Sequence, residues 1–463
     1  MPSFEYQDRE MYVQHYRSGQ GPGGPKLLRG VPTEAHRPRQ AGTTGGRGKG
    51  ALPRPLSEER LIPDSRTMMK AAFFHNLPTG GALRVAARQL SALRSDYAWT
   101  LFAPEGSARM PDVPGVSEKR VPFPRGGRGS IIGRLLFPVT LYRRLIRFDR
   151  TCREAAGMIR QSGAEVLLAH TSMIVAAPPL LRYLEVPSVY YSHEYPRCLY
   201  EKWINLTRWA LGDMLLPHVM LKLRRMDLQA ARGATVFVSN SEYMAARMRR
   251  IYDRDIRVVH PGVDTDLFSP STEYDLGGHV LSVGALSSFK GHHLVIRAVS
   301  RLPDPGRPRV VVVADRGSAR YGRHLYRLAD RLSVQLALLR DIPDPDLVQL
   351  YRTAKAVVCA QMNEPYGLVP LEAMSCGRPV VAVAQGGFPE NVEDGVTGIL
   401  VDRNEESITE ALERILGDRD FAEGLGENGR RFVLENRSVD EEMRQIRESL
   451  QEALRAGAAA DPD

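Results

Sequence analysis

Short apolar runs alternate with longer amphipathic stretches along most of the chain. The runs are rich in Val, Ile and Ala and have the length of buried strands, whereas the stretches between them carry apolar residues at helical spacing. Such alternation is typical of βαβ units around a parallel sheet, so the sequence predicts an α/β fold. The predicted strands are 71–74, 98–103, 166–169, 188–192, 236–238 and 257–259 in the first half, and 279–284, 308–314, 334–339, 355–360, 378–384 and 397–402 in the second.

The two groups of strands are separated by the polar segment HPGVDTDLFSP at 260–270, where Gly and two Pro end a strand. Two successive doubly wound halves fit a chain of 463 residues. Ligands bind beyond the carboxyl ends of the strands in open parallel sheets, so facing halves place a substrate in the cleft between them. We expect domains at 68–265 and 266–440, the second followed by a C-terminal helix and tail at 441–463.

Residues 1–67 lack the alternating pattern. Between Gly19 and Pro55 the chain has ten Gly and six Pro, a composition that cannot bury enough apolar surface to offset its ordering entropy. The segment carries 11 Lys/Arg against 7 Asp/Glu. We expect a disordered basic tail that is dispensable for folding, and Met68 or Met69, directly before the first strand, is an alternative start of the chain.

Composition narrows the class of protein. The chain is 43% hydrophobic and 25% charged, which is ordinary for a soluble globular protein, and no run approaches the roughly 18 apolar residues of a membrane span. The first residues, MPSFEYQDRE, lack the pattern of a secretory signal. The four cysteines form no C-x-x-C pair, which argues against a zinc ribbon or a disulfide framework. We therefore expect a cytoplasmic protein.

A formal net charge of +9 favours anionic partners, and its location matters. Residues 119–153 hold ten Lys/Arg and one acidic residue, Asp149, interleaved with apolar side chains. This segment fits a surface that binds anionic lipid on the inner face of the membrane. It fits equally well helices whose apolar stripe packs on the sheet while the aliphatic parts of the Arg side chains lie over it. Trp203, Trp209 and the run 214–223 fit an extension of that surface or a core-facing helix. No nucleic-acid motif accompanies the charge, so no nucleic acid is expected.

The most informative stretch is CAQMNEPYGLVPLEAMSCGRPVVAVAQGG at 359–387. A strand is followed by a loop with Gly367 and then by a helix, whose first free amides, near Leu368 and Val369, form an anion site together with the helix dipole.

Two carboxylates flank this helix start. Glu364 and Glu372 are placed to accept hydrogen bonds from the hydroxyls of a sugar or ribose. On spacing alone, a second interpretation fits as well: Glu372 complements the helix N-terminus and Glu364 is a solvated loop charge.

The pattern E-x-x-G-L-x-x-x-E-A-M-x-x-G-x-P-V-V-A, followed by Gly386-Gly387 and DGVTGILVD, resembles the nucleotide-sugar glycosyltransferases of family 4, which have the GT-B fold. The resemblance covers 68 to about 440. It implies two Rossmann-like domains facing a cleft and a retaining, hexosyltransferase-type enzyme. The donor would be a nucleotide-diphosphate sugar. The expected acceptor is a sugar, or a lipid-linked glycan if the basic segment at 119–153 contacts lipid. Other motifs in the order of that family are NLPTGGALR at 76, VFVSNSEY at 236, HPGVDTDLF at 260, SVGALSSFKG at 282 and IPDPDLVQLYRTAKAVVCA at 342.

The resemblance also implies roles for the residues around the helix start. Glu364 would contact the hydroxyls of the donor sugar and Glu372 the nucleotide ribose. The amides of Leu368 and Val369, after Gly367, would hold the diphosphate.

Three further positions take roles from the resemblance. Lys290, before a glycine, would neutralise the leaving diphosphate, and the backbone of Gly80 and Gly81 would approach the donor phosphates from the other domain. His193 would lie near the reacting carbon, where it orients the acceptor or bonds to the donor sugar. A histidine at a strand end is otherwise commonly structural, and His170 and His75 are rivals for the role.

One departure from the family pattern matters. Many members have Arg where this chain has Ala285, so half of a diphosphate clamp is missing. Either Lys290 and the helix amides suffice, or another cation such as Arg316 or Arg320 replaces it, or the affinity for the donor is lower. The alternative to an enzyme is therefore a catalytically weak protein of the same fold that binds nucleotide sugars or acts as a scaffold. The resemblance implies no metal site and no cofactor beyond the donor.

Overall fold

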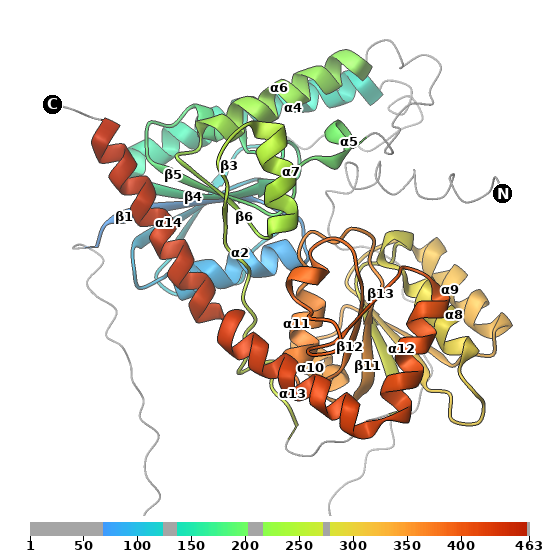
Figure 1. The fold of residues 1–463 in the computed structure, drawn as a ribbon. Coiled ribbons are helices and arrows are strands. Elements are labelled where there is room, and N and C mark those ends of the chain that lie inside the picture. The colour runs from blue at the N-terminus through green and yellow to red at the C-terminus, as the bar shows by residue number, and fades with distance from the viewer. Residues whose placement is uncertain (1–67, 124–136, 202–215, 272–277, 461–463) are drawn as a thin grey trace, which may run out of the picture.

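The computed structural model describes residues 68–123, 137–201, 216–271 and 278–460. The predictions for the tail at 1–67, for Trp203 and Trp209, and for the start of the run 214–223 lie outside these residues. The described chain forms two parallel sheets flanked by helices (Figure 1), which confirms the predicted α/β class.

The first sheet has seven parallel strands in the order β3-β2-β1-β4-β5-β6-β7. The strand order reverses between β1 and β4, so this is the topological switch point of the sheet. Ligands are expected at the loops that follow these two strands. The strands are β1 (Lys70–Asn76), β2 (Ala98–Pro104), β3 (Ser117–Val121), β4 (Val166–Ser172), β5 (Ser188–Ser192), β6 (Val236–Ser239) and β7 (Arg257–Val258).

The second sheet repeats this plan with six parallel strands in the order β10-β9-β8-β11-β12-β13. Here the order turns back between β8 and β11, so the loops that carry Lys290 and Glu364 both lie at the switch point. The strands are β8 (His279–Val283), β9 (Arg309–Ala314), β10 (Leu336–Arg340), β11 (Ala354–Cys359), β12 (Val380–Val383) and β13 (Ile399–Val401).

Helices cover the faces of both sheets, and their apolar stripes complete the cores. In the first domain they are α2 (Gly81–Ala92), α4 (Phe137–Ser162), η1 (Pro179–Arg182), α5 (Arg197–Tyr200), α6 (Leu216–Gly233) and α7 (Glu242–Tyr252). After these come η2 (Ser288–Lys290), α8 (His292–Arg301), α9 (Ala319–Arg331), α10 (Asp344–Arg352), α11 (Leu368–Ser375), η3 (Phe388–Glu390), α12 (Glu405–Gly417), α13 (Arg419–Asn436) and α14 (Val439–Ala460).

The sequence analysis missed strand β3. Its residues, SEKRV, are polar and mostly exposed, because β3 lies at the edge of the sheet, where β2 is its one partner among the described strands. A strand of this kind lacks the apolar run by which the central strands were recognised.

Helix α4 contains much of the basic segment at 119–153. Leu141, Leu145 and Phe148 are buried in the first core, whereas Tyr142 and Ile146 are exposed. In the described part, the apolar stripe therefore packs on the sheet as one of the two interpretations predicted, and 124–136 lies outside the described residues.

The chain crosses between the domains at two adjacent places. Val263, on the way to the second domain, forms a β-bridge with Ser438, on the way back. After this return α14 runs along the first domain (Figure 1), where Glu442 accepts hydrogen bonds from the Gly262 amide at 2.9 Å and from Gln89 Nε2 at 2.7 Å. The last long helix is therefore part of the first domain's structure.

None of the helices in the described residues is both long and apolar enough to span a bilayer. Across the same ranges, no group of three or more His, Cys, Asp and Glu side chains is arranged to hold a metal ion.

Candidate active site

The loop between β11 and α11 carries the predicted anion site. Gly367 caps the helix with φ 95° and ψ 82°, a left-handed conformation that side chains disfavour, and a Cβ here would lie 2.5 Å from the Phe388 ring. No side chain caps the helix, so its first amides, those of Leu368 and Val369, remain available to a ligand. Leu368 Cδ1 lies 3.9 Å from the position of a Cβ on Gly81, and the helix start therefore faces the glycine loop of the first domain.

Lys290 and Glu364 meet directly. Lys290 ends the short helix η2 after β8, and its Nζ donates to Glu364 Oε2 at 2.7 Å. Both side chains are about three-quarters buried, with 26% and 23% of their surfaces exposed. The fold thus brings together the two charged residues that the sequence assigned to the diphosphate and to the donor sugar.

Glu372 is held by a tyrosine that the sequence analysis did not identify. The fully buried Tyr351, on α10, donates its hydroxyl proton to Glu372 Oε2 at 2.6 Å. Burial raises the pKa of Glu372, while the Tyr351 hydrogen bond and the charge of Arg84 act in the opposite direction. The Tyr351 hydroxyl therefore fixes the position of Oε2, one of the two carboxylate oxygens of Glu372.

The glycine loop after β1 meets the second domain. Gly80, at φ 131°, lies against the guanidinium of Arg316, whose Nη1 donates to the carbonyl of Thr79. The Arg316 carbonyl in turn accepts from the amide of Leu286 at 2.7 Å, which places Arg316 beside Ala285. Arg316, one of the two cations proposed to replace the missing arginine, thus lies next to the loop that carries Ala285.

His193 follows β5 and is fixed through its backbone and its ring. Its amide donates to Thr171 Oγ1 at 2.9 Å, and its carbonyl accepts from Asn240 Nδ2 at 3.0 Å. Its ring Nε2 lies 3.0 Å from Nδ1 of His170. His193 is only 8% exposed and burial lowers its pKa to about 3, so the ring is neutral near pH 7.

Arg197 and Glu194, two residues that follow His193, extend the site and were not predicted. Arg197 pairs with Glu194 and donates from Nη2 to the carbonyl of Asn363 at 2.7 Å, across the domain interface. Burial raises the pKa of Glu194, Arg197 counters this, and the charges of Glu364 and Lys290 also act on the carboxyl. Through Arg197 and Asn363, the segment that follows His193 therefore contacts the loop that carries Glu364.

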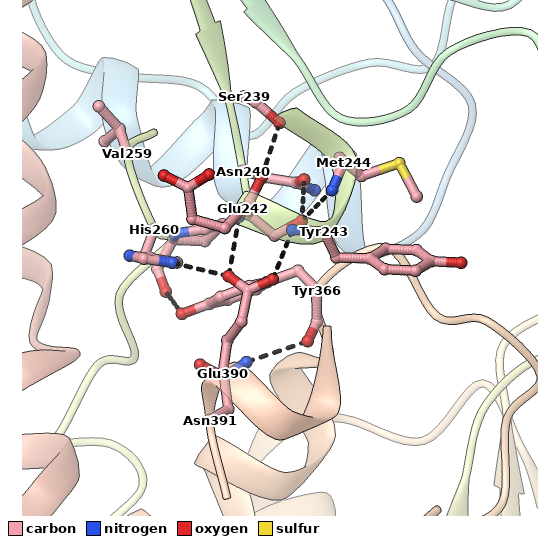
Figure 2. Close-up of polar contacts among 12 residues, drawn as sticks. Ser239, Asn240, Glu242, Tyr243, Met244, Val259, His260, Tyr366, Glu390 and Asn391 are labelled. Atoms are coloured by element: carbon pink, nitrogen blue, oxygen red, sulfur yellow. Dashed lines mark hydrogen bonds and ion pairs between the residues drawn. The ribbon is translucent and has the colours of Figure 1, made fainter. Parts of the chain in front are cut away.

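A second set of contacts joins the domains around Glu390, as Figure 2 shows. Its carboxylate accepts from the amides of Glu242 and Tyr243, at 2.8 and 2.6 Å, in the first turn of α7. His260 Nε2 lies 3.1 Å from the same carboxylate. The Tyr366 hydroxyl donates to the Pro261 carbonyl at 2.9 Å. These contacts hold the loop after β12 against the first domain.

The predicted residues thus fall into two groups at the domain interface. Lys290, Glu364 and Glu372 come from the second sheet's switch point, together with the helix start at 367–369. On the other side lie the glycine loop at 80–81 and His193. The rivals of His193 are set deeper, because His75 and His170 are fully buried.

The stability of the folded state should fall in acid, because several histidines are buried in their neutral form. Burial lowers the pKa of His75 and His193 to about 3 and that of His279 and His292 to about 4. Below pH 6.5 these histidines take up protons in the unfolded chain but stay neutral in the folded protein. Their contribution to stability is therefore complete above pH 6.5 and is lost as the pH falls towards 4. Three carboxyl groups oppose this, because burial raises the pKa of Asp227 to about 6 and also raises the pKa values of Glu194 and Glu372.

We therefore expect a lower urea midpoint at pH 5 than at pH 7.5, with a loss of up to about 2 kcal/mol for each fully buried histidine. Equilibrium unfolding followed by circular dichroism at both values tests this. An equal midpoint would mean that these rings take up protons without unfolding.

Two parallel α/β domains whose carboxyl-end loops meet define a GT-B-type architecture. Family models match in sequence order: "Glycosyltransferase Family 4" over residues 79–267 and "Glycosyl transferases group 1" over 266–432. The chain belongs to the family 4 glycosyltransferases, as its motifs indicated.

Curated relatives carry the name D-inositol 3-phosphate glycosyltransferase. The protein from Mycobacterium sp. (strain JLS) is 32% identical over 232 residues, which are 43% of this chain and 52% of the relative. That from Actinosynnema mirum is 33% identical over 265 residues, 49% of this chain and 63% of the relative. The chain spans about half the length of the curated relatives it matches.

Solved structures share the fold. Sucrose-phosphate synthase from Thermosynechococcus elongatus aligns with a TM-score of 0.66 at 19% identity, over 84% of this chain and all of the other. HepE from Anabaena in complex with UDP and glucose aligns with a TM-score of 0.63 at 19% identity, over 83% of this chain and 99% of that one. The predicted GT-B architecture is confirmed.

Proposed function

We propose that the protein is a retaining glycosyltransferase that moves a hexose from a nucleotide-diphosphate sugar to a hydroxyl of a sugar or lipid-linked glycan. The observation that carries the proposal is the meeting of Lys290, Glu364 and the open helix start of α11 at one switch point. A cation and free amides suit a diphosphate, and a carboxylate suits sugar hydroxyls. Family membership supports the same activity.

Each group has one task in this proposal. Lys290 and the amides of Leu368 and Val369 hold the diphosphate, whose charge grows as the donor's C1–oxygen bond breaks. Glu364 orients the donor sugar and Glu372 the ribose. The acceptor oxygen forms its bond to C1 on the same face, and its proton passes to a phosphate oxygen of the leaving group. This route needs neither a metal ion nor a carboxylate nucleophile.

The acceptor and the place of action belong to the same proposal. The names of the curated relatives make inositol 3-phosphate the first acceptor to test. Exposed Tyr142 and Ile146 alternate with exposed Arg143, Arg147 and Arg150 on α4, a surface suited to the inner face of an anionic membrane. Sedimentation with phosphatidylglycerol vesicles, against phosphatidylcholine vesicles, tests that contact.

The experiment that tests the function has two steps. A thermal-shift screen with UDP, GDP, ADP and their sugars identifies the base, because a ligand of the folded state raises its stability. Transfer is then followed by NMR with the donor found, and an α-linked product from an α-linked donor supports retention. Binding without hydrolysis or transfer, with every acceptor tried, would favour the binding or scaffold protein for which Ala285 is the supporting feature.

Arg316 is expected to supply the missing half of the diphosphate clamp. Its guanidinium already contacts the glycine loop, and its backbone bonds to Leu286, next to Ala285. Arg316→Ala should therefore weaken binding of the nucleoside diphosphate roughly tenfold or more, as for one charge-assisted hydrogen bond. Calorimetric titration measures the change. Arg320→Ala is the matched control, and adding Ala285→Arg to Arg316→Ala should restore affinity. If Arg316→Ala binds the diphosphate as tightly as the wild type, Arg316 has no part in the clamp and serves only to join the two domains.

A further inference from the structure

Three buried histidines lie side by side at the carboxyl ends of β1, β4 and β5. His75 and His170 occupy neighbouring positions, because Phe74 pairs with Ala169 in the parallel register. His193 follows β5, the next strand. All three pKa values are lowered, chiefly by burial, so the three rings are neutral near pH 7. Each ring then carries one proton, and which nitrogen carries it decides what the ring can do.

The contact between His170 and His193 allows two proton arrangements. Nδ1 of His170 lies 3.0 Å from Nε2 of His193, a hydrogen-bond distance. Either His170 donates and His193 accepts, or the reverse. In the first case neutral His193 carries its proton on Nδ1, and in the second it carries it on Nε2.

His75 decides between the two. The amide of Leu77, which can only donate, points at Nδ1 of His75 at 3.4 Å, so this nitrogen is bare and the proton sits on Nε2. Nε2 of His75 and Nε2 of His170 are both buried, and neither has a partner among the described residues. If His170 also carried its proton on Nε2, two N–H groups on adjacent strands would be buried without an acceptor. A bare Nε2 on His170 gives that region one donor and one acceptor, which is the less costly arrangement.

From this geometry we infer that His170 is a positioning residue, which donates from Nδ1 to Nε2 of His193 and so fixes His193 as the tautomer that carries its proton on Nδ1. Stacking of the His170 ring on Phe73, with centroids 4.9 Å apart, holds it in place for this.

The Nδ1–H of His193 is the group left for a substrate. No hydrogen bond within the described residues uses this nitrogen, and it is not among the buried polar atoms that lack a partner. His193 therefore offers a hydrogen-bond donor to an oxygen atom, such as a hydroxyl of the donor sugar. Because the exposed nitrogen already carries a proton, His193 does not remove the proton of the acceptor hydroxyl. This part of the inference rests on the proposed function.

The tautomer itself can be observed without any activity. In the full-length protein labelled with [15N]histidine, long-range 1H–15N spectra between pH 6.5 and 8 should show a protonated Nδ1 and a bare Nε2 for both His170 and His193. Spectra of His170→Asn and His193→Asn assign the signals. A protonated Nε2 on His193 would overturn the inference, and this outcome is independent of whether the protein transfers sugar.

A kinetic comparison tests the positioning role. His170→Leu removes the donated hydrogen bond and should lower kcat about tenfold, with little change in nucleotide affinity, while the proton of His193 moves towards Nε2. His170→Asn places an amide N–H near the position of Nδ1 and should restore most of kcat. His279→Asn, a buried histidine at the start of β8, controls for the loss of a histidine. Equal loss in the Leu and Asn variants, or no loss in either, would refute the positioning role.

Discussion

Replacing Lys290 with alanine is expected to lower turnover by about a hundredfold or more. The side chain is three-quarters buried and already pairs with Glu364 at 2.7 Å, so it is placed before any substrate arrives. The charge on a departing diphosphate grows as the bond to the sugar breaks, and a preorganised cation therefore assists the transition state more than the ground state. Steady-state kinetics with the true donor, together with nucleotide titration, measure the effect.

Two comparisons sharpen this expectation for Lys290. Binding of the nucleoside should barely change in Lys290→Ala, whereas the diphosphate should bind more weakly. Ala285→Arg, which restores the common family pattern, should tighten diphosphate binding in the wild-type background. If Lys290→Ala turns over at the normal rate, the charge is supplied by another side chain, and Arg316 is then the first to examine.

The two carboxylates are expected to separate binding from turnover. Glu372→Ala should weaken nucleotide binding roughly ten- to a hundredfold, because a charge-assisted hydrogen bond to the ribose is lost. Glu364→Ala should lower turnover by a similar factor. It should leave bare nucleoside diphosphate bound as well as before, or more tightly, because Lys290 loses its internal partner. Calorimetric titration measures the nucleotide affinity of each variant, and initial rates measure its turnover.

Tyr351→Phe is the matched control for Glu372. It removes only the hydrogen bond that fixes one carboxylate oxygen, so its effect on nucleotide binding should lie between wild type and Glu372→Ala. Should both glutamate variants keep normal kinetics with the true donor, the pair has a structural role and the proposed donor site is wrong.

Local sequence was enough for the parts of the site that are local in the fold. Gly367, Leu368 and Glu372 belong to one strand–loop–helix unit, whose spacing fixes the helix start and its carboxylate. The same holds for Lys290, which lies just beyond its strand. The alternation of apolar runs with amphipathic stretches predicted two α/β domains, and the family resemblance of the ordered motifs implied the GT-B architecture.

The missed residues act through contacts that spacing does not encode. Arg197 reaches a carbonyl 166 positions away, and Glu390 holds an amide 147 positions away in the other domain. Tyr351 lies within a quoted motif, but its hydroxyl meets Glu372 only because α10 packs beside α11. Domain packing determines these contacts, and a single sequence carries no signal for them.

The return of α14 to the first domain affects how the chain folds during synthesis. Met443, Ile446 and Leu450 are buried in the same core as Phe73 and Leu101. The ribosome makes that sheet first and this helix only after the second domain, so the apolar face under α14 stays uncovered while the whole second domain is produced. We therefore expect the first domain to become resistant to protease only after the C-terminal helix is released, and a chain shortened before residue 439 to expose a surface prone to aggregation.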